Sequence, residues 1–410
     1  MAYWWTVSTV LAVFASMFQY QILKKCPPRS IERGFLSAFV FGPMAISACC
    51  VIQAELKSIF PDVTLSAFLG SAPMFYAFHR LLCSDMYLGS DDVARTKKID
   101  NQGQAVDSRT AGGLRQFYDI FTNVRRIGHP DQAKNVPRFG QWPNIPSKSQ
   151  FVMFRGVRVG LLYVALDLMA STRENGIDMD KWTLPQLWEN SFPCEDTLTA
   201  IVYSLFYWLN GYIILMLQHD MISIVAVMAG IDNPSMWPPM FGSIRQSYTI
   251  RKFWGTFWHQ QLRLMLEGIS SFMVHTVLLI PKPSDKLEGQ RTSPLRLVTR
   301  YMKIVLAFGI SGLLHVGSDV GIGVPLAESR ALRFFLLQAL GIVLEDVAEA
   351  AWVRICGGGE SNEGISTLRK VLGYVWVLSY MGMTVPMWGV PISKASSDLK
   401  FVPISLFSKA

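Results

Sequence analysis

Residues 232–260, DNPSMWPPMFGSIRQSYTIRKFWGTFWHQ, are the stretch around which the rest of the chain is organised. The stretch opens with an Asn-Pro turn, continues through the double proline Pro238–Pro239, and then interleaves basic with aromatic residues up to His259. It is too polar and too rich in proline to span a bilayer, yet apolar segments flank it on both sides. A second histidine, His315, lies in one of these apolar runs, residues 307–317, AFGISGLLHVG.

The composition of the chain is that of a membrane protein. Of the 410 residues, 50% are hydrophobic and 17% are charged, whereas soluble domains carry roughly 25% charged residues. Repeated apolar runs of the length that crosses a bilayer predict an all-α, polytopic transmembrane helical bundle of about 8–10 spans. We expect His259 and His315 to face one buried reaction chamber inside this bundle.

The charge and the cysteines exclude other classes. The net charge of +8 is not gathered on a basic face of a soluble fold, so we expect a lipid bilayer and no nucleic acid as partner. Basic residues then mark cytosolic loops. The six cysteines are scattered without metal-ligand or disulfide spacing, so no metal site is predicted.

The chain divides into three predicted regions. Residues 1–83 form N-terminal transmembrane helices, residues 84–150 a long basic polar loop, and residues 151–410 the transmembrane core. Basic residues place that loop in the cytosol and therefore the N-terminus in the lumen. Within the loop, residues 114–128 show helical spacing of apolar residues, which predicts a helix on the membrane surface. Residues 221–230 are apolar but too short to cross unaided, which predicts a re-entrant or interfacial piece. The basic residues of the loop 281–300 leave open that this segment does cross.

Each histidine has a chemical and a structural interpretation. A neutral imidazole such as that of His315 takes a proton from an alcohol near neutral pH, but an intramembrane histidine can equally be a packing residue. Asp319, one turn later, either orients this imidazole or caps the next turn. Trp254 and Trp258 have the spacing of one helix face and lead to His259, which either polarises a carbonyl or belongs to an interfacial aromatic belt.

The charged residues of the core also leave two interpretations open. Arg245, Arg251 and Lys252 either hold the phosphates of a nucleotide-like cofactor or face anionic lipid headgroups. Acidic residues within apolar segments either form a proton path, as in a transporter, or lie at a polar edge. These acids are Asp167, Glu345, Asp346 and Glu349.

Two motifs, in order, resemble a known family. The first combines Asn233-Pro234 and Phe241-Gly242 with residues 251–259, RKFWGTFWH, and the second is the F-x-x-S-G-x-x-H run of residues 308–315. Together they resemble the wax-synthase-like branch of the membrane-bound O-acyltransferases. The resemblance covers the second half of the chain, and before Asn233 it rests on hydropathy and layout alone.

The resemblance implies an enzyme in which acyl-CoA enters from the cytosol and an alcohol from the membrane, with no permanently bound cofactor. It makes His315 the catalytic base and His259 a second catalytic residue, and either His259 or a nearby donor steadies the oxyanion. The general lipid acyltransferase branch often has Asn at the position of His259, which is a departure from that pattern. The residues that the resemblance assigns to the acyl-CoA side are Asn233, Arg245, Arg251, Lys252, Trp254 and Trp258.

The substrates are expected from resemblance alone. The chain looks most like fungal members that transfer acetyl groups from acetyl-CoA to hydroxyls of terpenoid or meroterpenoid secondary metabolites, in the endoplasmic reticulum membrane. A wax-ester synthase acting on long-chain acyl-CoA is the alternative within the family. A proton-coupled transporter, or a scaffold in which both histidines only pack, is the alternative from another class.

Overall fold

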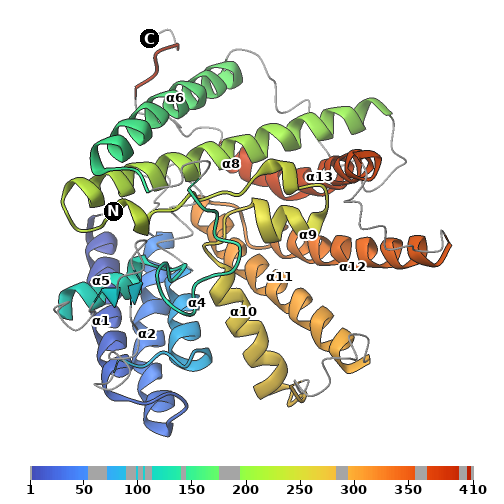
Figure 1. Ribbon diagram of the computed structural model, residues 1–410. Helices are drawn as coiled ribbons and strands as arrows, with labels where there is room; N and C mark the ends of the chain where they lie inside the picture. The colour runs from blue at the N-terminus through green and yellow to red at the C-terminus, as the bar shows by residue number, and fades with distance from the viewer. Residues whose placement is uncertain are drawn as a thin grey trace. The chain divides into compact units, whose positions relative to one another are not determined.

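The secondary structure of the described residues is almost entirely helical, with turns and irregular segments between the helices (Figure 1). The exception is a two-residue antiparallel pairing of β1 (Lys98–Ile99) with β2 (Ala105–Val106). The predicted all-α class is therefore confirmed. The computed structural model describes residues 2–53, 72–88, 98–99, 105–106, 113–139, 145–174, 194–282, 294–355, 367–396 and 404–407.

The helices form two compact units, each made of segments distant in sequence. Among the described residues, the first unit combines residues 2–53 and 72–134 with 261–344, and the second combines 135–260 with 345–407. The predicted boundaries at residues 83 and 150 concern placement in the membrane and stay a prediction. Each unit is described by itself below.

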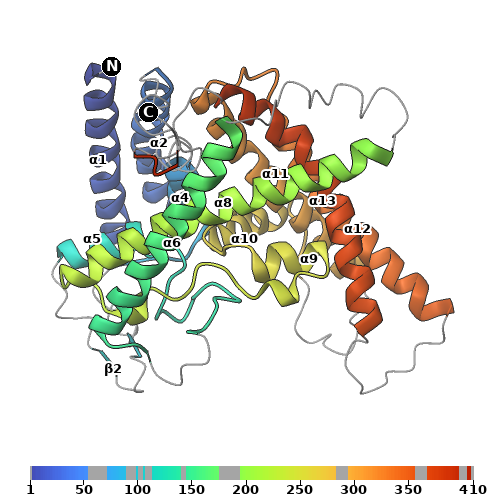
Figure 2. The same cartoon turned by 90° about the horizontal axis from the view of Figure 1, so that it is seen from above.

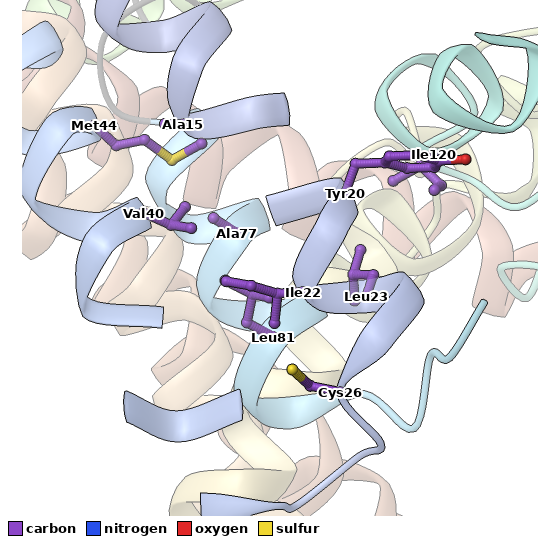
Figure 3. Packing of buried hydrophobic residues seen from close by; sticks show 10 residues of the cluster. All are labelled: Ala15, Tyr20, Ile22, Leu23, Cys26, Val40, Met44, Ala77, Leu81 and Ile120. Carbon is purple, nitrogen blue, oxygen red and sulfur yellow. The ribbon is translucent and has the colours of Figure 1, made fainter. Parts of the chain in front are cut away.

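The first unit begins with two neighbouring helices, α1 (Ala2–Lys25) and α2 (Ile31–Gln53), which Figure 2 shows side by side. Two prolines follow α1 and end it, because proline cannot continue a helix. The hydroxyl of Ser30 then accepts the backbone N–H of Arg33 at 3.2 Å and starts α2. Figure 3 shows the apolar core between these helices and their neighbours. Its buried residues are Ala15, Tyr20, Ile22, Leu23, Cys26, Val40, Met44, Ala77, Leu81 and Ile120.

Helix α5 (Gly113–Thr122) confirms the helix predicted in the polar loop, and its position on the membrane surface stays a prediction. Ile120 belongs to the core around α1, and Phe117 packs edge-on against Tyr20 with ring centroids 5.8 Å apart. The Tyr20 hydroxyl donates to Gln116 at 3.1 Å. The apolar face of α5 is therefore used inside the protein. Of the predicted polar loop, residues 89–97, 100–104, 107–112 and 140–144 lie outside the described residues.

The rest of the first unit packs around α10 (Arg263–Phe272), its π-helical continuation η7 (Met273–Val277), and α11 (Pro294–Ile322). Facing α10 are α4 (Ala72–Phe78) and the π-helical turn η2 (His79–Cys83). A Cβ at Gly268 would overlap the His79 ring, so glycine permits this close approach. The buried apolar residues here are Ala72, Tyr76, Met265, Ile269, Ile310 and Leu314.

The second unit is built on α8 (Cys194–Met228), which lies between α6 (Lys148–Glu174) and α13 (Thr367–Ala395) (Figures 1 and 2). Ser147 starts α6 with a capping box, in which its hydroxyl accepts the Gln150 N–H and its own N–H donates to the Gln150 side chain. At Gly389 of α13 a Cβ would lie 2.7 Å from the Tyr203 hydroxyl of α8. Glycine therefore sets how closely α13 approaches α8.

Helix α8 corrects one expectation. Residues 221–230 were expected to be a separate re-entrant or interfacial piece, but α8 continues without interruption to Met228. A helix of 35 residues exceeds the roughly 20 needed for one crossing. The added length contains His219, Asp220 and Ser223, which are polar and buried.

Within the described ranges, five helices are long and apolar enough to cross a membrane by length and composition. Helices α6 and α12 (Ala331–Ile355) are of comparable length but carry several charged residues. The total of about 8–10 spans stays a prediction. Large apolar side chains are exposed along these helices, as expected of surfaces that face lipid. The five candidate spans are Thr6–Lys25, Ile31–Cys50, Leu198–Met228, Pro294–Ile322 and Thr367–Ala395.

Candidate functional site

His315 lies on α11 in the first unit, and its ring orientation is set by its own helix. Its Nδ1–H donates to the carbonyl oxygen of Ser311, one turn earlier, at 2.7 Å. This bond fixes the neutral tautomer whose lone pair is on Nε2. An imidazole in this state can accept a proton at Nε2, which is the property that the predicted base requires.

Small and aromatic neighbours hold the His315 ring. The ring of Phe335, on α12, lies against it with centroids 4.4 Å apart. A Cβ on Gly312 would lie 2.8 Å from the Cα of Leu332, so this glycine brings α11 and α12 together. Asp319 accepts a hydrogen bond from the Ser329 hydroxyl at 2.6 Å and so fastens the turn after α11. Of its two expected roles, the turn-fastening one has a contact in the structure.

The first motif, residues 233–259, is folded as a turn followed by a short helix, all within the second unit. Asn233 is exposed at the start of the 3-10 turn η4 (Pro234–Met236). The motif continues through η5 (Ile244–Gln246) to α9 (Ile250–Lys252) and then to the π-helical turn η6 (Phe253–Phe257).

The motif helix consists of α9 and η6 together, residues 250–257. Glu345 and Thr249 hold its start. The Thr249 hydroxyl accepts the Lys252 N–H at 3.0 Å as an N-cap. The Glu345 carboxylate accepts the backbone N–H groups of Ile250 and Arg251, and it also accepts the Trp376 indole N–H at 3.0 Å. A carboxylate at a helix N-terminus is favoured by the helix dipole.

The end of the motif helix is held through its carbonyl groups. A π-helical turn leaves such carbonyls without partners in the helix, and π-turns are frequent at functional sites. Asn135 donates to the Gly255 carbonyl at 2.7 Å, and Gln260 donates to the carbonyls of Trp254 and Trp258. The Gly242 N–H donates to the Phe257 carbonyl at 2.8 Å. A Cβ on Gly242 would overlap the backbone of Thr256, so the motif needs glycine there.

His259 follows η6 and is lined by aromatic rings. The backbone becomes extended at Trp258, so His259 leaves the helix instead of lying at the start of one. Its ring lies 5.5 Å from the Trp258 ring and 6.0 Å from the Phe241 ring, between centroids. Trp254 and Trp258 do come together, but chiefly by packing on Trp208 of α8, at 5.5 and 4.5 Å.

The three basic residues of the motif have different surroundings. The Arg251 guanidinium forms an ion pair with Asp346 at 2.6 Å, which neutralises much of its charge. The Lys252 ammonium donates to the Tyr248 hydroxyl and lies 4.0 Å from the centre of that ring. Arg245 is exposed, and its backbone carbonyl accepts the Tyr374 hydroxyl at 2.8 Å. Its part in phosphate binding stays a prediction.

His259 and His315 belong to different units, and each is described within its own. The expectation that both face one chamber stays a prediction. What the structure brings together in the second unit is His259, Trp254, Trp258 and the basic residues of one short motif. In the first unit, Phe335 packs against His315, and Gly312 brings α11 and α12 close together one turn before His315.

Comparison with known proteins identifies the family. The model of the membrane bound O-acyl transferase family matches residues 237–337. Acetyltransferase ataH from Aspergillus terreus is 32% identical over 292 residues, which are 69% of this chain and 90% of ataH. This chain belongs to the membrane bound O-acyl transferase family.

Two further relatives are also named acetyltransferases. Acetyltransferase spyB from Aspergillus fumigatus is 30% identical over 307 residues, 70% of this chain and 50% of spyB. Acetyltransferase TRI7 from Fusarium sporotrichioides is 31% identical over 303 residues, 70% of this chain and 66% of TRI7. The chain thus spans half of spyB and just under two thirds of TRI7.

As an O-acyltransferase with several candidate spans, the protein is a multi-pass membrane enzyme. Three of the acids on which the transporter alternative depended have structural partners. Glu345 caps the motif helix and Asp346 pairs with Arg251. Asp167, fully buried on α6, accepts the Ser405 hydroxyl at 2.6 Å and the Leu406 N–H at 2.5 Å. These contacts account for three of the four acids on which the transporter alternative depended.

The sequence did not indicate several residues that support the acyltransferase motif. Gln260 and Asn135 hold its carbonyls, and Trp208 packs its two tryptophans. Gln260 is the last residue of the stretch 232–260, but the sequence does not indicate that its side chain binds carbonyl groups of that stretch. Asn135 and Trp208 are distant in sequence from the motif, and no sequence signal connects them to it.

Proposed function

We propose that this acyltransferase transfers an acetyl group from acetyl-CoA to a hydroxyl of a terpenoid or meroterpenoid-type secondary metabolite, in the endoplasmic reticulum membrane. The choice of acetyl as the transferred group rests on the match to ataH, which is named an acetyltransferase. This chain covers 90% of ataH at 32% identity. The acceptor class and the compartment rest on the resemblance to fungal members of the branch.

The proposed chemistry uses His315 as the general base. Its Nε2 takes the proton of the acceptor hydroxyl, and the resulting oxygen nucleophile attacks the thioester carbonyl carbon. His259 donates a hydrogen bond to the oxyanion of the tetrahedral intermediate. The carbon–sulfur bond then breaks, and the CoA thiolate takes the proton back from His315. The Nδ1–H bond to Ser311 supports this role, because it keeps a proton on Nδ1 and so makes Nε2 the nitrogen whose lone pair accepts the hydroxyl proton.

The donor is bound as a co-substrate, with no permanent cofactor. Arg245 supplies an exposed charge for its phosphates, whereas Arg251 and Lys252 are engaged with Asp346 and Tyr248. We assign the first contact with the phosphates to Arg245, and the aromatic side chains around Trp254 and Trp258 to the acyl end.

Radiolabel transfer in microsomes tests the proposal. Microsomes that contain the protein receive labelled acetyl-CoA or, separately, labelled palmitoyl-CoA, with a panel of hydroxylated terpenoids and fatty alcohols. We expect label to move from acetyl-CoA to a terpenoid and the transfer to be lost in His315→Ala. Transfer only from palmitoyl-CoA to a fatty alcohol would replace acetyl transfer by wax-ester synthesis. Transfer unchanged by His315→Ala would refute the assigned base.

A further inference from the structure

A network of buried charges joins α6 to α8 in the second unit, away from the motif helix itself. Its centre is Arg155 of α6, whose Nη1 donates to the Ser223 hydroxyl at 2.7 Å and to Nδ1 of His219 at 3.1 Å. The same guanidinium lies 3.1 Å from the Asp220 carboxylate and 4.3 Å from the centre of the Phe151 ring. His219, Asp220 and Ser223 are buried on α8, within a candidate membrane span.

The pairing of Asp220 alone does not explain this network. Arg158, one turn after Arg155 on α6, already binds both Asp220 oxygens, at 2.5 and 2.7 Å. That bidentate pair neutralises the carboxylate. A second buried cation beside it carries a desolvation cost, and intramembrane charges of this kind are usually kept for function. The contacts that Arg155 makes and Arg158 lacks therefore indicate the purpose of Arg155.

One such contact reaches the motif region. Nη2 of Arg155 donates to the backbone carbonyl of Trp237 at 2.5 Å. The indole N–H of Trp237 donates to Asp232 at 3.1 Å, and its ring lies edge-on to His219 with centroids 5.4 Å apart. Trp237 is thus held at its carbonyl, at its indole nitrogen and at its ring, in each case by a group of the second unit.

The chain after Trp237 is stiff and leads directly to His259. Pro238 and Pro239 follow, and each fixes its own φ near −65°. Two residues later Phe241 packs against Trp258 at 5.0 Å and against His259 at 6.0 Å, between ring centroids. The two fixed φ angles limit how far the intervening backbone can absorb a displacement of Trp237 before it reaches Phe241.

We propose that Arg155 is a positioning residue, which holds Trp237 so that the double proline and Phe241 set the orientation of the His259 ring. The inference rests on the proposed function for its effect on catalysis, because His259 is there the residue that steadies the oxyanion. Its geometric part, from Arg155 to the His259 ring, does not depend on which acyl group is transferred.

Two matched lysine variants test the catalytic part. Arg155→Lys keeps a cation near Asp220, but one ammonium cannot bind Asp220, His219 and the Trp237 carbonyl at the same time. Arg158→Lys makes the same chemical change at the other partner of Asp220, whose guanidinium binds Asp220 while the Trp237 carbonyl is bound by Arg155. We expect kcat for acetyl transfer to fall about tenfold or more in Arg155→Lys, with KM for acetyl-CoA unchanged. Arg158→Lys is expected to keep the wild-type kcat.

A second variant and a second measurement keep the test independent of folding and of substrate. Pro239→Gly preserves every polar contact of Arg155 but loosens the chain before Phe241. In both Arg155→Lys and Pro239→Gly, the rate at which diethyl pyrocarbonate modifies His259, followed by mass spectrometry, is expected to change severalfold. His129 and His275, in the first unit, serve as internal controls of intact folding.

The outcomes separate this inference from the proposed function. If the wild type transfers no acetyl group, the proposed function fails, and the modification rates of His259 still decide the positioning role. Equal kcat values for the two lysine variants, or an unchanged His259 modification rate in both Arg155→Lys and Pro239→Gly, would overturn the inference. Should Arg155→Lys fail to fold, Pro239→Gly alone decides it.

Discussion

Gly312→Ala should damage the His315 site by moving α12, and the size of the effect follows from the helix crossing. The new Cβ would lie 2.8 Å from the Cα of Leu332, where carbon atoms prefer about 3.5–4.0 Å. The backbone of α12 must therefore move by about 1 Å. The same Cβ would lie 3.4 Å from the Cβ of Phe335, whose ring packs on His315. A misplacement of about 1 Å costs roughly a hundredfold in rate, and overpacking costs about 1–3 kcal/mol of stability.

The assay compares Gly312→Ala with Gly309→Ala, one turn earlier on the same helix. At Gly309 the nearest atom to a new Cβ is Leu336 Cδ2 at 3.8 Å, an ordinary contact. We expect Gly309→Ala to keep wild-type kcat and to raise stability by about 0.5–1 kcal/mol, because it replaces a helical glycine. Acetyl transfer and thermal unfolding are measured for both variants in detergent. Equal kcat and equal melting temperature for the two would refute the argument from the helix crossing.

Three further predictions concern charged residues. Glu345→Ala leaves two backbone N–H groups and an indole without their acceptor, so it should destabilise the enzyme by about 1–3 kcal/mol in thermal unfolding. Glu349 is exposed, so Glu349→Ala is the control. An equal loss of stability in that variant would contradict the role of Glu345 as a helix cap. Arg245→Ala should raise KM for acetyl-CoA severalfold at constant kcat, and a loss confined to kcat would remove Arg245 from phosphate binding. Asp167→Ala should release residues 404–407, so that a protease removes a C-terminal tag faster; an unchanged rate would show that the tail is held by other contacts.

The parts of this protein that sequence determined are those that depend on neighbours along the chain. Apolar runs predicted the helices that carry the candidate spans, because crossing a bilayer requires each helix to satisfy its own backbone. The two ordered motifs predicted the family, and that prediction is confirmed. The tautomer of His315 is also local, since Ser311 lies one turn away on the same helix.

Some outcomes needed information from outside the segment concerned. The periodicity of α5 showed an apolar face but not which groups cover it, and the structure packs Phe117 and Ile120 in the core around α1. Residues 221–230 were judged by their own length, whereas the turn before them is helical too and α8 continues through both.

Only the tertiary structure decided which charges are available for chemistry. Arg245 and Arg251 look alike in the motif, but Asp346 pairs with Arg251 and leaves Arg245 exposed. Arg155 showed no relation to the motif until its contact with the Trp237 carbonyl became visible. An ion pair or hydrogen bond depends on distances of a few ångströms between segments that can be a hundred residues apart. Sequence specifies which groups need partners, because buried charges and π-turn carbonyls are costly alone, and the packing of helices specifies which partners they find.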